Sequence, residues 1–566
     1  MRRAARPCTQ GFRPFWHVAA ACRTAFAGRL PLRQTNRCEG GEHASDLNRF
    51  SRRSTMTHPT PNLLILMADQ LTPFALPAYG NRVARTPTLD RLAAQGVVFD
   101  AAYCASPLCA PSRFSLLTGK LPSAIGAYDN AAELPAQTLT FAHYLRAAGY
   151  RTVLSGKMHF CGPDQLHGFE ERLTTDIYPA DFGWVPDWAH PEERPSWYHN
   201  MSSVLDAGPC VRTNQLDFDD EVAFAARQKL FDLARERAAG QDARPFCMVV
   251  SLTHPHDPYA ITRDYWDLYR DDEIDMPAVR LDLADCDPHS RRLRAVCEND
   301  RTPPTDAQIR NARHAYYGAT SYVDTQFGNV LAALEQCGFA DDTIVIVTSD
   351  HGDMLGERGL WYKMTFFEGG CRVPLIVHAP GRFDAARVAG PVSHVDLLPT
   401  LVELAGGAPD GGWPDPVDGA SLVPHLRGAP AHDVALGEYL AEGAIAPIVM
   451  IRRGDWKYVH CPADPDQLYH LKDDPRELHN LAGAPHAADV LAAFRAEAAA
   501  RWNLAELHGQ VLASQRRRRF HFAATTQGRI HAWDWQPFAD ASQRYMRNHL
   551  ELDTLEAMAR FPRIAR

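Results

Sequence analysis

Four continuous apolar runs predict strands that are buried on both faces of a sheet. They span residues 63–68, 246–252, 343–348 and 373–378, and a shorter strand is predicted at 151–155. Runs of this length without polar alternation are typical of parallel strands that helices cover on both sides. The pattern therefore predicts a sheet at the centre of the fold.

Helical segments alternate with these runs. Pro87 at a first helical position predicts a helix over 87–95. Three more helices are predicted, one beginning after Pro111, one over 138–148 and a long one within 309–337. This alternation is typical of a doubly wound α/β fold, in which ligands bind beyond the carboxyl ends of the strands.

The remaining segments predict less regular parts. Residues 160–220 are rich in Trp, Tyr, Pro and Asp and predict long ordered loops, and a Gly- and Pro-rich stretch at 408–430 predicts a linker. A hairpin is expected over 448–461 with its turn at Gly454-Asp455, and a helix over about 486–515.

These patterns divide the chain into four regions. We expect a disordered or non-native extension at 1–55, a catalytic domain at 56–425, a C-terminal subdomain at 426–515, and a tail at 516–566 that contributes to oligomerisation and the substrate pocket. The arginines at 516–519 are expected to form a solvated helix end rather than a nucleic-acid patch.

Charge is distributed unevenly between the first region and the rest. Residues 1–55 hold eleven Arg and three Asp or Glu, so they carry about +8 in a chain whose formal net charge is −9. The remainder is therefore acidic, which argues against a nucleic-acid surface on the folded part. No apolar run is long enough to span a bilayer, and Arg23 and Arg29 interrupt the one stretch that resembles the core of a secretory signal.

The cysteines also bear on the compartment. They number thirteen, an odd count, and they show neither framework spacing nor a CxxC pair. This usage favours a reducing cytoplasm, in which most of the thiols are small buried side chains.

One cysteine stands in a motif of its own. The segment Cys109-Ala-Pro-Ser-Arg113 is followed by Leu116-Leu-Thr-Gly119. A buried cysteine ahead of a helical turn would explain the pentapeptide alone. However, three further motifs stand in order around it, at 62–70, 149–159 and 348–353.

Together these motifs resemble type I sulfatases of the alkaline phosphatase-like superfamily. The resemblance implies an α/β fold with a large, mixed, mostly parallel sheet flanked by helices, a smaller C-terminal α+β subdomain and an extended tail. It also implies that formylglycine-generating machinery oxidises the Cys109 side chain to an aldehyde. The hydrate of that aldehyde would attack the sulfur of a sulfate ester and later expel sulfate.

Acidic residues beyond the strand ends predict a metal site beside Cys109. Asp69 and Asp350 follow buried runs, and His351 adds an imidazole. A site dominated by carboxylates suits Ca²⁺, with Mg²⁺ or Mn²⁺ as alternatives. The resemblance adds Cys109 itself and Gln70 to the ligands. Sulfatases usually carry a second Asp at the Gln70 position, so the site here has one negative charge fewer.

The resemblance assigns further catalytic positions. Arg113 would steady the formylglycine hydrate, and Lys157 and Lys363 would neutralise sulfate oxygens in the transition state. His159 would act as general base for the second hydroxyl of the hydrate.

Two neighbouring histidines remain as alternatives for one role. His254 and His256 follow the predicted strand at 246–252. One of them would bind sulfate or protonate the leaving oxygen, and the sequence leaves open which of the two does so.

A closer resemblance within the family is to choline sulfatases, carried by segments 128–130, 162–184 and 545–550. A quaternary ammonium cannot donate a hydrogen bond, so a protein recognises it through cation–π contacts and carboxylates. The candidate substrate contacts are Trp184, Asn130, Glu442 and Asp534, with Trp188, Trp197 and Tyr198 as weaker candidates near Trp184.

The sequence thus predicts a metal-dependent sulfuric ester hydrolase that cleaves choline sulfate to choline and sulfate, in glycine betaine biosynthesis. We expect a cytoplasmic homo-oligomer, a dimer of dimers, without membrane or nucleic-acid partners. A phosphonate or phosphate monoester hydrolase, or an arylsulfatase of the same superfamily, is the first alternative. The second is an inactive protein that binds quaternary ammonium solutes.

Overall fold

The computed structural model describes residues 60–178, 181–407, 412–429, 431–529 and 551–560. The predicted extension at 1–55, Asp534 and the segment 545–550 lie outside the described residues, as does part of the predicted linker. Among the described residues, no helix combines the length and apolar character needed to cross a membrane.

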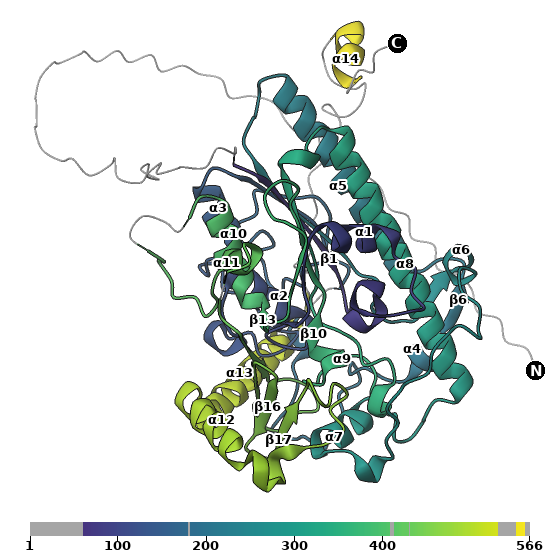
Figure 1. Cartoon of the computed structure of the whole chain (residues 1–566), viewed down its shortest axis with the longest axis vertical. Coiled ribbons are helices and arrows are strands. Elements are labelled where there is room, and N and C mark those ends of the chain that lie inside the picture. The colour runs from purple at the N-terminus through teal and green to yellow at the C-terminus, as the bar shows by residue number, and fades with distance from the viewer. Residues whose placement is uncertain (1–59, 179–180, 408–411, 430, 530–550, 561–566) are drawn as a thin grey trace, which may run out of the picture. The chain divides into compact units, whose positions relative to one another are not determined.

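A sheet of eight strands lies at the centre of the molecule (Figure 1). Its strands are β1 (Asn62–Ala68), β2 (Val97–Phe99), β4 (Arg151–Gly156), β5 (Glu171–Arg172), β7 (Phe246–Leu252), β9 (Thr343–Ser349), β11 (Leu375–His378) and β12 (Ala386–Val388). They follow the order β12-β2-β11-β9-β1-β7-β4-β5. β1 pairs in parallel with β7 and β9, whereas β11 pairs antiparallel with β9 and β2. The predicted mixed, mostly parallel sheet is confirmed.

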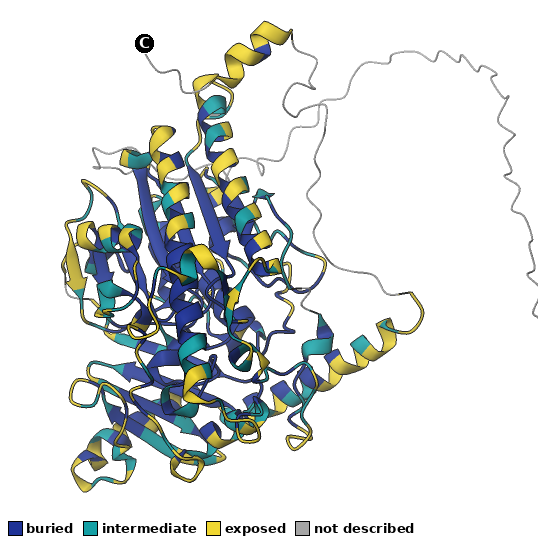
Figure 2. Ribbon diagram, turned by 90° about the vertical axis from the view of Figure 1, so that its right-hand side faces the viewer, coloured by how far each residue is buried: buried dark blue, intermediate teal, exposed yellow. Residues whose placement is uncertain are grey.

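Helices cover both faces of this sheet, which explains why β1 is apolar from Leu63 to Ala68. Leu64 and Leu66 belong to one core cluster, and Leu63 and Ile65 belong to another on the opposite face. Figure 2 shows the central strands as buried and the outer sides of the helices as exposed. The helices of the first cluster are α1 (Pro87–Gln95), α5 (Asn214–Ala238) and α8 (Asp306–Gln336), and those of the second include α2 (Cys109–Thr118), α3 (Phe141–Ala147) and α10 (Leu397–Leu404).

A second, antiparallel sheet forms the C-terminal subdomain. Its four strands are β14 (Val434–Tyr439), β15 (Ile448–Arg453), β16 (Trp456–Cys461) and β17 (Asp464–His470). The predicted hairpin is β15 and β16, and Gly454 at its turn has a φ of 53°, which glycine adopts at little cost. Helix α12 (Ala488–Arg501) packs Leu491 and Phe494 against this sheet.

The structure corrects the sequence analysis at the C-terminal helix. The helix predicted over 486–515 is two helices, α12 and α13 (Leu504–Thr525), because the Asn503 side chain caps α13 by accepting a hydrogen bond from Glu506 N at 3.2 Å. The arginines at 516–519 lie inside α13 rather than at its end, and Arg518 is 7 % exposed. The prediction of a solvated arginine run was therefore wrong for Arg518.

Helix α5 was missed altogether. It begins within the region predicted as loops, where Thr213 accepts a hydrogen bond from Leu216 N at 3.1 Å. An N-capping Thr followed by apolar residues at helical spacing was the available signal.

Candidate active site

The register of the parallel strands brings two carboxylates together. β1 and β9 pair with Ala68 opposite Ser349, so Asp69 and Asp350 leave the sheet side by side. Both carboxylates are fully buried. This is the edge of the sheet at which the sequence placed the site.

Helix α2 presents Cys109 to these carboxylates. Cys109 is the first residue of the helix, and all ten residues of α2 are buried. Its Sγ lies 3.2 Å from His351 Nε2. One residue further, Ala110 N donates a hydrogen bond to Asn130 Oδ1 at 3.0 Å, which fixes the start of the helix.

Arg113 holds the two carboxylates one helical turn after Cys109. Its Nη2 lies 3.0 Å from Asp69 Oδ2 and its Nε lies 2.9 Å from Asp350 Oδ2. Nη1 donates to Lys157 O at 2.7 Å and to Ser251 Oγ at 2.9 Å. Burial works against the charged guanidinium, but Asp350 and Asp69 outweigh it and raise the pKa of Arg113. The side chain thus links the ends of four strands, β1, β4, β7 and β9, to the nucleophile helix.

Four side chains around Cys109 fit a divalent cation. The donor atoms of Asp69, Cys109, Asp350 and His351 all lie within 4.8 Å of one another. Asp69 Oδ1 is buried and accepts no hydrogen bond from the described residues. Burial opposes ionisation of Asp69, but Lys157 leads the neighbouring charges that hold its pKa well below the usual range. Ionised carboxylate oxygens beside an imidazole suit a hard or borderline cation.

Gln70 has a different environment from these four residues. Its Oε1 accepts a hydrogen bond from Lys363 Nζ at 2.6 Å, and its Nε2 donates to Asp353 Oδ2 at 2.7 Å. Burial raises the pKa of Asp353 to about 6. The amide oxygen that could ligate a cation is therefore already shared with an ammonium group.

The two predicted lysines reach the site from opposite sides. Lys157 Nζ pairs with Asp69, lies 3.9 Å from Cys109 Sγ and sits 4.4 Å from the centre of the Tyr178 ring. Lys363 Nζ bonds Gln70 Oε1 and lies 2.8 Å from His256 Nε2. Both ammonium groups are buried, and neighbouring negative groups outweigh burial and raise their pKa values. The single negative charge of a sulfate ester, and the charge that builds on its oxygens in the transition state, can be neutralised between them.

The structure separates the two neighbouring histidines. His256 lines the pocket beside Lys363, and its Nδ1 lies 2.7 Å from Asp257 O. Burial, together with Lys363, holds the pKa of His256 well below its usual value. His254 bonds Asp219 Oδ2 through Nδ1 at 2.7 Å and is not among the described residues that line the pocket.

His159 lies on the far side of Lys157. Its backbone φ is 63°, in the left-handed region, and its N–H donates to Asp176 Oδ2 at 2.9 Å. Both ring nitrogens are buried without a hydrogen-bond partner among the described residues. A strained backbone that carries an unbonded imidazole into a pocket is typical of a functional position.

A pocket of about 280 Å³ opens beyond Cys109, Lys157 and Lys363. Trp184 and Trp197 stack nearly parallel in its wall, with ring centres 6.4 Å apart and an interplanar angle of 11°. The remaining members of the wall include Asn130, Tyr178, Tyr198, His199, Asp257 and Glu442. The aromatic character of this wall contrasts with the charged floor.

Glu442 is the exceptional residue of this wall. The side chain is 1 % exposed, and neither carboxylate oxygen has a hydrogen-bond partner among the described residues. Burial raises its pKa to about 7, and the charge of Asp129 adds to this effect. A buried carboxylate without a partner is costly unless a ligand supplies a positive charge.

The structure places most of the predicted substrate residues in the pocket and one of them elsewhere. Asn130, Trp184, Trp197 and Tyr198 line the pocket. Trp188 instead packs in the core, where its Nε1 donates to Ala441 O at 3.1 Å.

Sequence reasoning missed seven residues that line the pocket, and three of these seven have titratable side chains. These three are Tyr178, His199 and Asp257. Tyr178 and His199 lie in the Trp- and Tyr-rich region 160–220, and Asp257 follows His256. Their closeness in sequence to predicted site residues was the available signal.

Comparison with known proteins gives consistent results. The family model described as Sulfatase matches residues 61–408, and the model described as Choline sulfatase enzyme C terminal matches 509–561. A third model, for the C-terminal part of N-sulphoglucosamine sulphohydrolase, matches residues 356–502 and overlaps the end of the Sulfatase match.

Similar proteins cover most of the chain. A choline-sulfatase of Rhizobium meliloti is 48% identical over 90% of this chain and 100% of its own length. Arylsulfatase K of Danio rerio is 30% identical over 75% of this chain and 81% of its own. The crystal structure of a phosphonate monoester hydrolase of Agrobacterium radiobacter superposes with a TM-score of 0.61 at 26% identity, over 80% of this chain and 96% of that one.

The family model spans more than half of the chain, and its motifs coincide with the residues gathered at the strand ends. The family is dependent on formylglycine and a metal, in agreement with the position of Cys109 and the donor set around it. The chain belongs to the sulfatase family of sulfuric ester hydrolases.

Proposed function

We propose that this sulfatase hydrolyses choline sulfate to choline and sulfate. The observation that carries the proposal is the unpartnered, buried carboxylate of Glu442 in an aromatic pocket that opens onto Cys109. An aryl group offers nothing that would offset the burial of this charge and a sugar offers only neutral hydroxyl donors, whereas a quaternary ammonium supplies a full positive charge. Similarity to the choline-sulfatase of Rhizobium meliloti over 90% of the chain supports the same substrate.

The chemistry at Cys109 follows from the family. The thiol in the structure stands where the formylglycine hydrate would be, and that hydrate supplies one hydroxyl to attack sulfur and a second to expel sulfate. Asp69, Asp350 and His351 would hold the divalent cation, which would polarise the sulfate oxygens and acidify the hydrate. We propose calcium as this cation because the donor set is rich in carboxylates.

Side chains of this protein handle charge and protons around that centre. Lys157 and Lys363 bind the sulfate oxygens and balance the charge that develops as the ester bond breaks. Arg113 keeps Asp69 and Asp350 in place, because its guanidinium group donates to both carboxylates and is itself held by Lys157 O and Ser251 Oγ.

Two histidines serve the two proton transfers. His256 accepts a proton at Nε2 from the ammonium group of Lys363, which lies 2.8 Å away, and relays it to the leaving choline oxygen. His159 takes the proton from the second hydroxyl, so that sulfate leaves and the aldehyde is restored. His254 serves as a structural residue bonded to Asp219.

Further features extend the proposal beyond the described residues. Asp534 of a neighbouring subunit would add a second carboxylate to the ammonium pocket, in a cytoplasmic dimer of dimers that supplies choline for glycine betaine synthesis. The C-terminal match at 509–561 supports a role for this tail, which the four-region division assigns to 516–566.

A substrate comparison tests the proposal. Protein with oxidised Cys109 is assayed on choline sulfate, an aryl sulfate and a phosphate monoester at equal concentrations. We expect the highest kcat/KM for choline sulfate. A higher value for the phosphate monoester would favour a phosphonate or phosphate monoester hydrolase, to which the structural similarity at 26% identity also points. A protein that binds choline without turning over any ester would be an inactive binder.

A further inference from the structure

Lys363 sits on an unusual piece of backbone. The residues on either side of it, Tyr362 and Met364, have φ values of 64° and 73°. Both angles lie in the left-handed region, which side chains other than glycine adopt only when surrounding contacts require it. The ammonium group must nevertheless reach both Gln70 Oε1 and His256 Nε2. The direction of Lys363 therefore depends on whatever holds these two neighbours.

Polar contacts hold both neighbours through their peptide groups. Tyr362 N donates to Asp353 Oδ1 at 3.1 Å, and Tyr362 O accepts from Met354 N at 2.7 Å. Met364 N donates to Pro107 O at 3.0 Å, two residues before Cys109. The remaining group, Met364 O, lies 2.8 Å from His289 Nε2.

The local structure holds the His289 side chain in place for its hydrogen bond to Met364 O. It belongs to α7 (Pro288–Val296), whose N-terminus is capped by Asp287, the acceptor for Ser290 N at 3.0 Å. Because a carbonyl oxygen only accepts hydrogen bonds, Nε2 carries the ring proton and donates a hydrogen bond to Met364 O. The side chain is 7 % exposed, and burial lowers its pKa, so the imidazole stays neutral.

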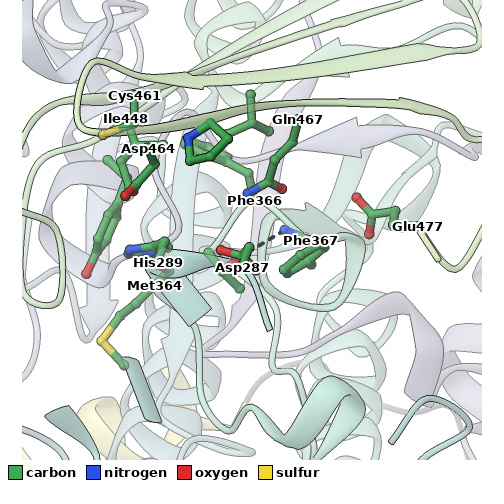
Figure 3. A pocket seen from close by; sticks show the side chains of 14 residues that line it. Asp287, His289, Met364, Phe366, Phe367, Ile448, Cys461, Asp464, Gln467 and Glu477 are labelled. Carbon is green, nitrogen blue, oxygen red and sulfur yellow. Dashed lines mark hydrogen bonds between the residues drawn. The ribbon is translucent and has the colours of Figure 1, made fainter. Parts of the chain in front are cut away.

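Packing leaves a gap beside the loop. Tyr362 and Met364 are buried in the main core, but a cavity of about 20 Å³ lies next to Met364, lined by residues of α7, of the loop and of the C-terminal sheet. Figure 3 shows His289 next to Met364 at one wall of this cavity, with strands of the C-terminal subdomain on the other side. Lys457 Nζ donates to Phe366 O at 2.6 Å further along the loop. Hydrogen bonds to backbone carbonyls therefore add to packing in holding the loop.

We propose that His289 is a positioning residue for Lys363, acting through the carbonyl oxygen of Met364. The inference rests on the proposed role of Lys363 in binding the sulfate group. Without the donor at Nε2, Met364 is free to leave its left-handed conformation, and the ammonium group moves away from Gln70 and His256. Since the sulfate group is common to all substrates, the loss is the same for choline sulfate and for an aryl sulfate.

A double-mutant cycle with Lys363 tests this inference. His289→Leu replaces the imidazole with an apolar side chain of similar length and so removes the donor. It is expected to lower kcat/KM about tenfold on both substrates. His289→Gln restores an N–H donor and is expected to recover most of that loss. In a Lys363→Met background, His289→Leu is expected to change the remaining activity by less than about twofold, because the group that it positions is gone.

A matched control separates positioning from stability. His314 is also buried, at 1 % exposure, and its Nε2 contacts a backbone carbonyl, that of Trp266, at 2.9 Å. His314→Leu is expected to lower the melting temperature but to leave kcat/KM unchanged while the protein is folded. An equal loss from His289→Leu in both backgrounds, or wild-type activity in His289→Leu, would overturn the inference.

The same set of variants keeps the inference apart from the proposed function. Wild-type turnover by Lys363→Met would remove the role of Lys363 and the inference with it. Failure of the wild-type enzyme on choline sulfate would remove only the proposed substrate, because the cycle can be completed on the aryl sulfate.

Discussion

The two ends of the pocket treat buried charge in opposite ways. At the sulfate end, Arg113 pairs with Asp69 and Asp350, and Lys157 pairs with Asp69. At the alcohol end, Glu442 is as deeply buried, yet its carboxylate has no hydrogen-bond partner among the described residues. The carboxylates of one end are paired with cationic side chains of the protein, and the carboxylate of the other end has no such partner among the described residues.

This difference shows where catalysis and specificity are placed. Paired ions at the sulfate end are preorganised for the group that every sulfate ester shares, so changes there should affect all substrates alike. The burial cost of Glu442 is offset only when a cationic alcohol binds, so changes there should separate substrates. Each prediction below tests this division.

The largest effect is expected at the sulfate end. Cys109→Ala removes the side chain from which the nucleophile is made, and turnover of both choline sulfate and an aryl sulfate should fall by at least about 1,000-fold. Initial rates on both substrates measure this loss, and circular dichroism checks that the fold persists. A loss confined to one substrate would break the comparison.

The next effect is expected at the alcohol end. Glu442→Gln keeps the shape and removes the charge, and KM for choline sulfate should rise about 30-fold, equivalent to about 2 kcal/mol of lost attraction in a dry site. KM for the aryl sulfate should change less than about twofold.

Glu438→Gln is a matched control for this change. Glu438 is also a fully buried carboxylate with a raised pKa caused by burial, but it accepts hydrogen bonds from Ser123 and Trp502. The control should leave both KM values unchanged. An equal rise in KM for both substrates in Glu442→Gln would place Glu442 outside the recognition of choline.

A smaller effect is expected at the aromatic wall. Trp184→Ala removes one ring of the Trp184–Trp197 pair, and KM for choline sulfate should rise about tenfold, which matches a desolvated cation–π contact. The aryl sulfate should be affected much less. Trp456→Ala, which removes a partly buried ring that makes an edge-to-face contact with His470 outside the pocket, serves as control. Similar changes for both substrates would remove Trp184 from the ammonium site.

The sulfate end was also the more predictable end from sequence. Asp69, Cys109 and Asp350 each lie directly after a strand or at the start of a helix, so local motifs and parallel pairing determine where they meet. The residues of the alcohol end lie on separate loops, and Glu442 is far along the chain from the others. Their meeting depends on loop paths that no local periodicity encodes, so candidates such as Trp184 and Glu442 could be named from the family resemblance and from residue type, but not from a predicted geometry.

The same reasoning explains what was missed elsewhere. Arg518 was predicted to be solvated because four consecutive arginines favour a charged surface. In the structure it forms a buried pair with both carboxylate oxygens of Asp129, next to Asn130 in the pocket wall. A partner 389 positions away cannot be read from the composition of a helix.

The smallest effect concerns pH, and its sign follows from Glu442. Burial and the charge of Asp129 raise its pKa to about 7, while Lys363 acts in the opposite direction. The ionised carboxylate attracts an ammonium group, and the protonated form does not. Binding of choline should therefore be strong above pH 7 and should weaken as the pH falls below it.

Inhibition of aryl sulfate turnover by choline measures this dependence without relying on the chemistry of choline sulfate. Between pH 8 and pH 6 the ionised fraction of a group with this pKa falls about tenfold, so the Ki of choline should rise about tenfold. In Glu442→Gln the Ki of choline should be high and independent of pH over the same range, because the titrating carboxylate is gone. A Ki that depends on pH equally in both proteins would assign the titration to the paired sulfate end, and the two ends would then not be independent.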